Sequence, residues 1–317
     1  MHQADSSMRK RGQINIVLKK QRSGAEERQS TPVPLTDEAH APFRQVEKAL
    51  SALVGLDEMK TFMKEVYAWL YLNKKRQESG LITGKQTLHM VFKGNPGTGK
   101  TTVARIAADM LREMGVLEKG HLIEAERADL VGEYIGHTAQ KTRDLIKKSL
   151  GGILFIDEAY SLARGGEKDF GKEAIDTLVK AMEDQQHEFV LILAGYPNEM
   201  DRFLSLNPGL PSRFPLKVSF PDYTVKELST IAVNMLENWQ YRLHDLAEDQ
   251  LERILYAEKG RDEAHFSNGR FIRNLLERAI RHQAVRLLES GDYGKEALQI
   301  IRADDLIKSY EKHPFSS

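Results

Sequence analysis

The sequence predicts an α/β fold, with a five-stranded parallel sheet between layers of helices and a smaller helical domain after it. Two observations predict this fold. Between residues 84 and 221, short apolar runs alternate with segments of helical periodicity, which is typical of parallel strands joined by crossover helices. After Pro221 the strand-like runs stop and only long helical patterns follow.

Each expected element has its own signal. The first helix begins near Thr36, and a second helix opens at Asp57. Short apolar runs predict five strands at Leu88–Phe92, His121–Ala125, Gly152–Ile156, Phe189–Ala194 and Leu216–Phe220. Helical periodicity predicts further helices at Thr102–Met114, around Ala174–Met182, at Thr224–Lys259, at Phe271–Ser290 and at Ala303–Tyr310.

The chain is expected to have three parts. Residues 1–35 form a flexible polar and basic tail, because six Lys or Arg and no acid fall between Arg9 and Arg22. Within it, Gln13–Leu18 has the pattern of a short strand. Residues 36–221 form the α/β domain, and residues 222–317 form the helical domain.

Composition excludes several classes of site and partner. The 317 residues contain no cysteine, which excludes disulfides, thiolate zinc sites and cysteine catalysis. Lys and Arg total 46, as do Asp and Glu, so net charge gives no support for nucleic acid or an anionic membrane as partner. No apolar run comes near the roughly twenty residues that span a bilayer, and no signal-peptide core is seen. The expectation is a cytoplasmic protein.

A phosphate-binding loop follows the first expected strand. The pattern G-x-x-x-x-G-K-[ST] is met by Gly94, Gly99, Lys100 and Thr101, with a strand before it and a helix after it. Glycine backbone can curl so that several N–H groups meet phosphate oxygens, while Lys100 reaches the β- and γ-phosphates and the Thr101 hydroxyl ligates Mg²⁺. The predicted ligands are ATP and Mg²⁺, and the residues expected to hold them here are Gly94, Asn95, Pro96, Gly97, Thr98, Gly99, Lys100, Thr101 and Thr102.

Two carboxylates end the third expected strand. Asp157 and Glu158 directly follow the apolar run Gly152–Ile156, and such a pair is costly at the end of a buried strand unless it meets a cation or a polarised water. Asp157 is expected to hold Mg²⁺, directly or through water. Glu158 is expected to orient and deprotonate the water that attacks the γ-phosphate. ATP hydrolysis, beyond binding, therefore depends on Glu158.

The phosphate-binding loop, with four stretches of the chain, resembles the AAA+ ATPases, and within them the stage V sporulation protein K family. The red-type rubisco activases of the same branch are also similar. The resemblance covers roughly residues 45–300, and the stretches that carry it are Asp129–Thr142, Gly151–Tyr160, Leu193–Tyr196 and Asn207–Leu210.

The resemblance implies further site residues. Val54 and Gly55, with Leu56, match the segment that packs the adenine. Arg213 matches an arginine finger that reaches the γ-phosphate of the neighbouring subunit. Arg270 matches the sensor 2 arginine, with Arg273, one turn further on, as the competing candidate. The sensor 1 position is open, because neither Tyr196 nor Asn198 aligns with it.

In ring-forming relatives, an aromatic–hydrophobic–glycine loop faces a central pore and grips a polypeptide. Tyr134, Ile135 and Gly136 match this pore loop; the alternative is that Tyr134 packs on its own domain. The ten histidines show no ligand-pair spacing, so structural or surface roles are expected for them.

The expected function is that of a ring-forming ATPase, expected to be a hexamer, that remodels an unidentified protein client in spore maturation. Four alternatives stay open: a rubisco-activase-like remodeller, a nucleic-acid motor or clamp loader, an ATP-dependent switch that hardly turns over, and a compact monomeric kinase. Neither nucleic acid nor a membrane is expected as a partner.

Overall fold

The structure is a computed structural model, and it describes residues 41–84, 87–134, 136–165, 169–207, 209–261 and 266–311. The expected tail at 1–35, with its short strand at Gln13–Leu18, lies outside these ranges, as does the start of the first helix near Thr36.

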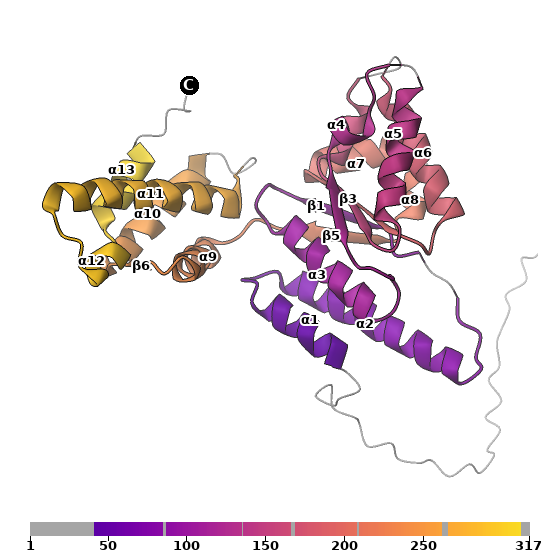
Figure 1. The fold of residues 1–317 in the computed structure, drawn as a ribbon, viewed down its shortest axis with the longest axis horizontal. Helices are drawn as coiled ribbons and strands as arrows, with labels where there is room; N and C mark the ends of the chain where they lie inside the picture. The colour runs from indigo at the N-terminus through magenta and orange to yellow at the C-terminus, as the bar shows by residue number, and fades with distance from the viewer. Residues whose placement is uncertain are drawn as a thin grey trace, which may run out of the picture.

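The five expected strands are present and form one parallel sheet (Figure 1). They are β1 (Met90–Gly94), β2 (Leu122–Ala125), β3 (Ile153–Ile156), β4 (Val190–Gly195) and β5 (Leu216–Phe220). The order β2-β3-β4-β1-β5 places β1 between β4 and β5, with Met90 opposite both Ile192 and Leu216. Ligands of open parallel sheets bind at the carboxyl ends of the strands, beside such a change of strand order.

Helices cover both faces of the sheet. Alternate strand residues face opposite sides, so Met90 and Phe92 pack under α1 (Ala41–Ser51), α2 (Asp57–Glu78) and α3 (Lys100–Glu113). On the other face, Val91 packs with the buried residues of α5 (His137–Ser149), α6 (Gly171–Asp184) and α7 (Pro197–Leu206). Three short helices join these layers: α4 (Arg127–Leu130), η2 (Ala159–Ala163) and α8 (Leu210–Arg213).

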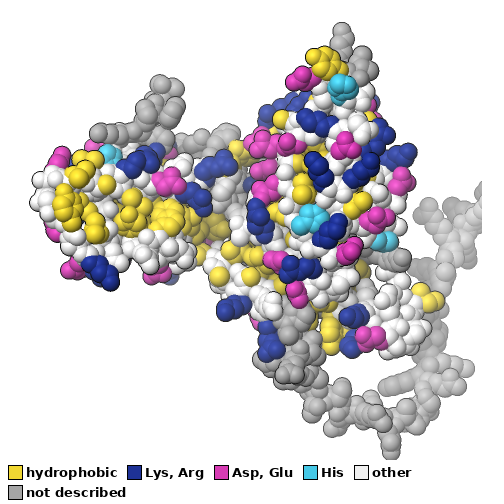
Figure 2. All heavy atoms as spheres, in the orientation of Figure 1, with side chains coloured by type: hydrophobic (Ala, Val, Ile, Leu, Met, Phe, Trp, Pro, Cys, Tyr) yellow, Lys and Arg dark blue, Asp and Glu magenta, His cyan; other side chains and the backbone are white. Residues whose placement is uncertain are grey.

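The C-terminal part, called the lid here, is helical and lies beside the carboxyl edge of the sheet (Figure 1, with the same view as spheres in Figure 2). It contains α9 (Val225–Asn238), α10 (Asp245–Arg261), α11 (Asn268–Ser290), α12 (Lys295–Gln299) and α13 (Ala303–Glu311). A capping box between Thr224 and Glu227 begins α9. The apolar core under α1–α3 continues into the lid through Tyr223 and Leu228.

The helix expected over residues 224–259 is interrupted in the structure. α9 ends at Asn238, and Gln240 adopts a left-handed backbone with φ 63°. The Tyr241 N–H then closes the turn on the Leu236 carbonyl at 2.8 Å. Two-residue strands, β6 (Arg242–Leu243) and β7 (Ile300–Ile301), pair in parallel beyond this turn. No glycine or proline lies at the break, so the helical periodicity of the sequence did not predict it.

Within the described ranges, no helix is long and apolar enough to cross a membrane. The same ranges contain no group of three or more His, Cys, Asp or Glu side chains placed to hold a metal ion. His89 is buried in the sheet, where its Nδ1 accepts the Leu191 N–H at 3.0 Å and burial lowers its pKa to about 4.

Candidate active site

The phosphate-binding loop joins β1 to α3 and curls tightly at its glycines. Gly97 and Gly99 adopt left-handed backbone with φ 71° and 95°, which β-carbon-bearing residues rarely do. Gly94 needs its small size for a different reason, since a Cβ there would lie 2.5 Å from the Phe220 carbonyl oxygen. The positive end of the α3 dipole is therefore directed at the curl of the loop.

The Lys100 ammonium lies inside this curl. Its Nζ donates to the carbonyl oxygens of Gly94 and Asn95, at 2.9 and 2.8 Å, and the residue is 8% exposed. Burial lowers the pKa of Lys100, while the Asp157 carboxylate acts in the opposite direction. A buried cation with two neutral carbonyl partners is an incomplete pairing, so an anion is the complement that this loop fits.

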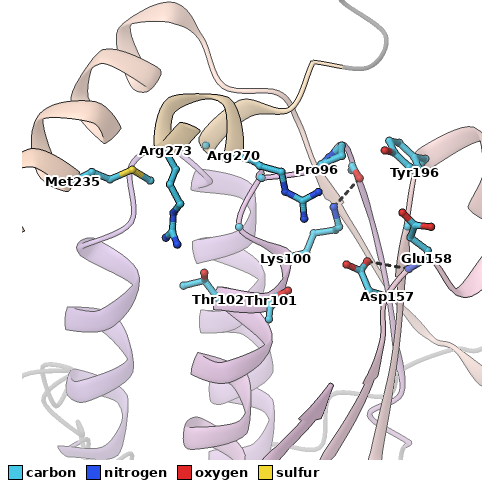
Figure 3. Close-up of a pocket in the computed structure, with 15 residues that line it drawn as sticks. Pro96, Lys100, Thr101, Thr102, Asp157, Glu158, Tyr196, Met235, Arg270 and Arg273 are labelled. Atoms are coloured by element: carbon cyan, nitrogen blue, oxygen red, sulfur yellow. Dashed lines mark hydrogen bonds between the residues drawn. The ribbon is translucent and has the colours of Figure 1, made fainter. Parts of the chain in front are cut away.

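Asp157 and Glu158 follow β3 and lie opposite the loop, as Figure 3 shows. Asp157 Oδ1 accepts the Glu158 N–H at 3.0 Å. Glu158 has φ 46° and ψ 42°, a left-handed conformation that costs about 1–3 kcal/mol for a residue of this kind. This turn at the strand end separates the directions of the two carboxylates, so the pair can serve two roles.

One cavity of about 370 Å³ brings these groups together with residues of the lid (Figure 3). The sheet side supplies the loop, both carboxylates and Tyr196, and the lid supplies Met235, Arg270 and Arg273. The lining residues are Gly94, Pro96, Gly97, Gly99, Lys100, Thr101, Thr102, Asp157, Glu158, Gly195, Tyr196, Met235, Gly269, Arg270 and Arg273.

Both candidate sensor 2 arginines line the cavity, at different depths along the loop. In Figure 3 the Arg270 side chain extends toward Lys100, and the Arg273 side chain extends toward Thr102. The positive charge of Arg270 also lowers the pKa of Lys100, which places it in the field of the loop. Arg270 is therefore the arginine on the Lys100 side of the cavity.

Tyr196 lies at the tip of β4, where the sequence left the sensor 1 residue undecided. Its ring lines the cavity and lies 6.0 Å from the Tyr160 ring, centre to centre. Burial, helped by the Glu158 charge, raises the pKa of Tyr196. Asn198 is exposed and does not line the cavity. Of these two residues, only Tyr196 therefore lies at the cavity.

The residues expected to pack the adenine lie next to the loop. Val54 and Gly55 do not line the cavity itself. A Cβ on Gly55 would lie 2.2 Å from Glu227 Oε1 on the lid, and a Cβ on Gly99 would lie 3.5 Å from Leu56. The turn at residues 54–56 is therefore in contact with both the loop and the lid.

Arg213 does not line the cavity of its own chain. It ends α8, and its guanidinium pairs with Glu183 of α6, with Nε 3.1 Å from Oε1. A further N–H, on Nη1, donates to the Gly209 carbonyl at 2.5 Å. In this chain the Arg213 side chain is therefore held by α6 and by the start of α8, outside the cavity.

Tyr134 projects from the segment between β2 and α5 and is 66% exposed. Its ring makes an edge contact with His137 at 5.4 Å. Gly136 has φ 83°, and a Cβ there would meet nothing within 4 Å. Ile135, the third residue of the expected pore loop, lies outside the described residues.

Sequence reasoning missed three residues that the structure places at the site: Asp222, Tyr223 and Met235. Met235 lines the cavity from α9, and Asp222 and Tyr223 connect the sheet to the lid while contacting the loop. Met235 lies on an apolar helical stripe, and such a position predicts a core residue. Asp222 lies at the predicted domain junction, and that position was the available signal.

Comparisons with known proteins agree with this architecture. Residues 90–222 match the AAA family, described as the ATPase family associated with various cellular activities, and residues 224–315 match the AAA lid domain. A Thermotoga maritima RuvB mutant structure superposes with a TM-score of 0.53 at 23% identity, covering 83% of this chain and 71% of that chain. At this identity the likeness concerns the fold alone.

Curated relatives match over most of their length. Stage V sporulation protein K of Bacillus subtilis is 61% identical over 301 residues, which is 93% of this chain and 94% of that protein. The chloroplastic ribulose bisphosphate carboxylase/oxygenase activase of Cyanidioschyzon merolae is 47% identical, over 81% of this chain and 88% of its own. The CfxQ homolog of Guillardia theta is 46% identical, over 84% and 92%. The chain belongs to the AAA family of ATPases, in the group that contains stage V sporulation protein K and the CfxQ proteins.

Proposed function

We propose that this chain binds MgATP in the cavity between the loop and the lid and hydrolyses it to ADP and phosphate. The observation that carries the proposal is the buried Lys100 ammonium facing Asp157 and Glu158 across one cavity. The loop N–H groups and Lys100 hold the phosphates, and Arg270 contacts them from the lid. The base would pack against the turn at Val54 and Gly55, a role supported by the contact of this turn with the loop and the lid.

The donor set fits a magnesium ion. The Thr101 hydroxyl and the Asp157 carboxylate line the same cavity, and hard oxygen ligands of this kind suit Mg²⁺ beside substrate phosphates. The ion would neutralise charge on the β- and γ-phosphate oxygens. Glu158 accepts a proton from the attacking water, and Tyr196 lies beside it to orient that water or the phosphate.

Arg213 completes the site from a neighbouring subunit in this proposal. Its position away from the cavity of its own chain supports a role in trans, which requires a closed ring of identical subunits. A hexamer is the proposed assembly. A guanidinium placed on the γ-phosphate in this way stabilises charge that grows during transfer.

The work proposed for the ring is remodelling of a protein client. Exposed Tyr134, followed by Gly136 with its free surroundings, supports a loop that grips a polypeptide without reading its sequence. The similarity to stage V sporulation protein K supports a client in spore maturation, with rubisco remodelling as the alternative. The cytoplasm is the proposed location.

Replacement of Tyr134 by alanine tests the grip. We expect basal ATP hydrolysis within about twofold of the parent, because Tyr134 does not line the nucleotide cavity. Binding of fluorescein-labelled casein, an unstructured polypeptide, to the ATP-loaded Glu158→Gln assembly should be lost when Tyr134→Ala is added. Fluorescence anisotropy measures this binding.

The matched control is Tyr256→Ala, since Tyr256 is 65% exposed but lies on the lid. Casein binding that survives Tyr134→Ala, or that falls equally with Tyr256→Ala, contradicts the grip. The grip is also contradicted if the ATP-loaded Glu158→Gln assembly with Tyr134 intact does not bind casein.

A further inference from the structure

The segment that joins the sheet to the lid is hydrogen-bonded on both of its sides. Asp222 and Tyr223 form this segment, between the end of β5 and the capping box of α9. On the lid side, the Tyr223 N–H donates to Asn268 Oδ1 at 3.0 Å, and Lys259 Nζ donates to the Tyr223 carbonyl at 2.7 Å. The connection is therefore fixed to α10 and α11 and moves with the lid.

Asn268 is the centre of this contact. Its side chain is fully buried, and its backbone has φ 44°, a left-handed conformation that asparagine tolerates better than most residues. Its Nδ2 donates to Asp222 Oδ1 at 2.7 Å and to the Phe266 carbonyl at 2.9 Å. Disturbing a buried amide whose donors and acceptor are all hydrogen-bonded is costly, because each group left unpaired keeps its desolvation penalty.

The same residues reach the phosphate-binding loop. The second oxygen of Asp222 accepts from Asn95 Nδ2 at 2.9 Å, and the Tyr223 hydroxyl donates to the Thr98 carbonyl at 3.1 Å. The Gly269 N–H, at the start of α11, donates to the Gly97 carbonyl at 3.1 Å. The backbone approach is close, because a Cβ on Gly97 would lie 2.4 Å from the Ser267 carbonyl oxygen.

These bonds hold the loop by its carbonyl groups. In a trans peptide the C=O and N–H groups point in opposite directions, and the structure has no cis peptide in the described residues. Fixing the carbonyls of Gly97 and Thr98 toward the lid therefore turns the next N–H groups, those of Thr98 and Gly99, away from it. A carbonyl that accepts a hydrogen bond also polarises its peptide and strengthens the N–H as a donor.

We propose that the Asp222–Asn268 pair couples phosphate binding to lid position by positioning the Tyr223 hydroxyl and the Gly269 N–H, which hold the carbonyl side of the loop. Phosphates that bind the loop N–H groups strengthen the bonds to the lid, and a lid held by those bonds presents the N–H groups in order for phosphates. The coupling is reciprocal, as binding linkage requires. Asp222 and Asn268 act as positioning residues, separately from Arg270, which contacts the nucleotide from the cavity side. This inference rests on nucleotide binding at the proposed site.

The test is an exchange of the two polar side chains. Asn268→Asp removes the donor and sets two carboxylates against each other, and Asp222→Asn sets two amide donors against each other, since Asn95 and Asn268 both donate to Asp222. The double variant restores one donor and one acceptor across the pair. We expect each single variant to bind ADP about tenfold or more weakly, and the double variant to lose less than the sum of the two single losses. The exchange restores the bond between residues 222 and 268, but the bond to the Phe266 carbonyl stays broken. Isothermal titration calorimetry measures these affinities.

A second readout follows the lid directly. The chain has no cysteine, so Ser205→Cys on α7 and Glu289→Cys on α11 introduce the only thiols for spin labels. Both positions are exposed. In the parent, ADP should narrow the distribution of distances between the labels. At saturating ADP the single variants should keep a broad distribution of label distances, and the distribution of the double variant should narrow.

The coupling would be overturned if both single variants bound ADP with the affinity of the parent and showed the same narrowing of the label distances. Losses in the double variant equal to the sum of the single losses would do the same, since they show no interaction between the pair. Thermal unfolding is recorded for every variant, and the near-isosteric Asp222→Asn carries the test if Asn268→Asp unfolds. A parent that binds ADP but releases no phosphate from ATP contradicts the proposed function and leaves the coupling intact.

Discussion

Replacing Glu158 with glutamine is expected to lower ATP hydrolysis by at least about a hundredfold while ATP stays bound. Glutamine keeps the size of the side chain and its place in the cavity, but it cannot take a proton from water. Lys100, Thr101 and the loop N–H groups are unchanged, so the contacts with the phosphates persist. Phosphate release measures hydrolysis, and a fluorescent ATP analogue measures binding.

The matched control is Glu199→Gln. Glu199 is exposed on α7, close to Tyr196 in sequence, and it does not line the cavity. Its replacement should leave hydrolysis within about twofold of the parent. Hydrolysis that survives Glu158→Gln would assign the base to another residue and would remove the main argument for Glu158.

Replacing Arg213 with alanine is expected to lower hydrolysis by about a thousandfold, within the range that arginine fingers show. Arg213 does not line the cavity of its own chain, so the effect requires that its guanidinium enter the cavity of a neighbouring subunit. The contacts of Arg213 with Glu183 and Gly209 must open before the guanidinium can reach a neighbour's phosphate, and at a partly exposed pair this costs little. Arg202→Ala, at an exposed arginine of α7, is the control and should have little effect.

A mixture of two inactive variants separates action in trans from action in cis. In a mixed ring, an Arg213→Ala subunit keeps Glu158, and a Glu158→Gln neighbour supplies Arg213, so part of the sites become complete. Phosphate release should therefore rise when the two variants are combined. A mixture as inactive as its components, with mixed assemblies shown by differential labels, would contradict action in trans.

The α/β fold could be predicted because its signals are local. Each strand is a short apolar run, and each site motif lies within about ten consecutive residues. The break after Asn238 was missed for the opposite reason, since Gln240 takes a left-handed backbone that asparagine or glycine more often signals. Its turn is stabilised by packing and by pairing with a strand far along the chain.

The contacts across the lid could not be predicted from spacing. Asp222 and Asn268 are 46 residues apart, and Tyr223 reaches Thr98 across 125 residues. The hydrogen bond that joins Gly97 to Gly269 involves backbone atoms, which leave no side-chain signature. The choice between Arg270 and Arg273 as the sensor 2 arginine also depends on how the lid meets the loop, so spacing in the sequence left it open.

The most direct test of the central claim is the rate of ATP hydrolysis per subunit across a wide range of protein concentration. The account predicts that the specific rate rises with concentration and follows the appearance of assemblies by size-exclusion chromatography, because each site needs Arg213 from a neighbour. A specific rate that stays constant down to concentrations at which only monomer is present would contradict it, since each subunit would then be sufficient by itself.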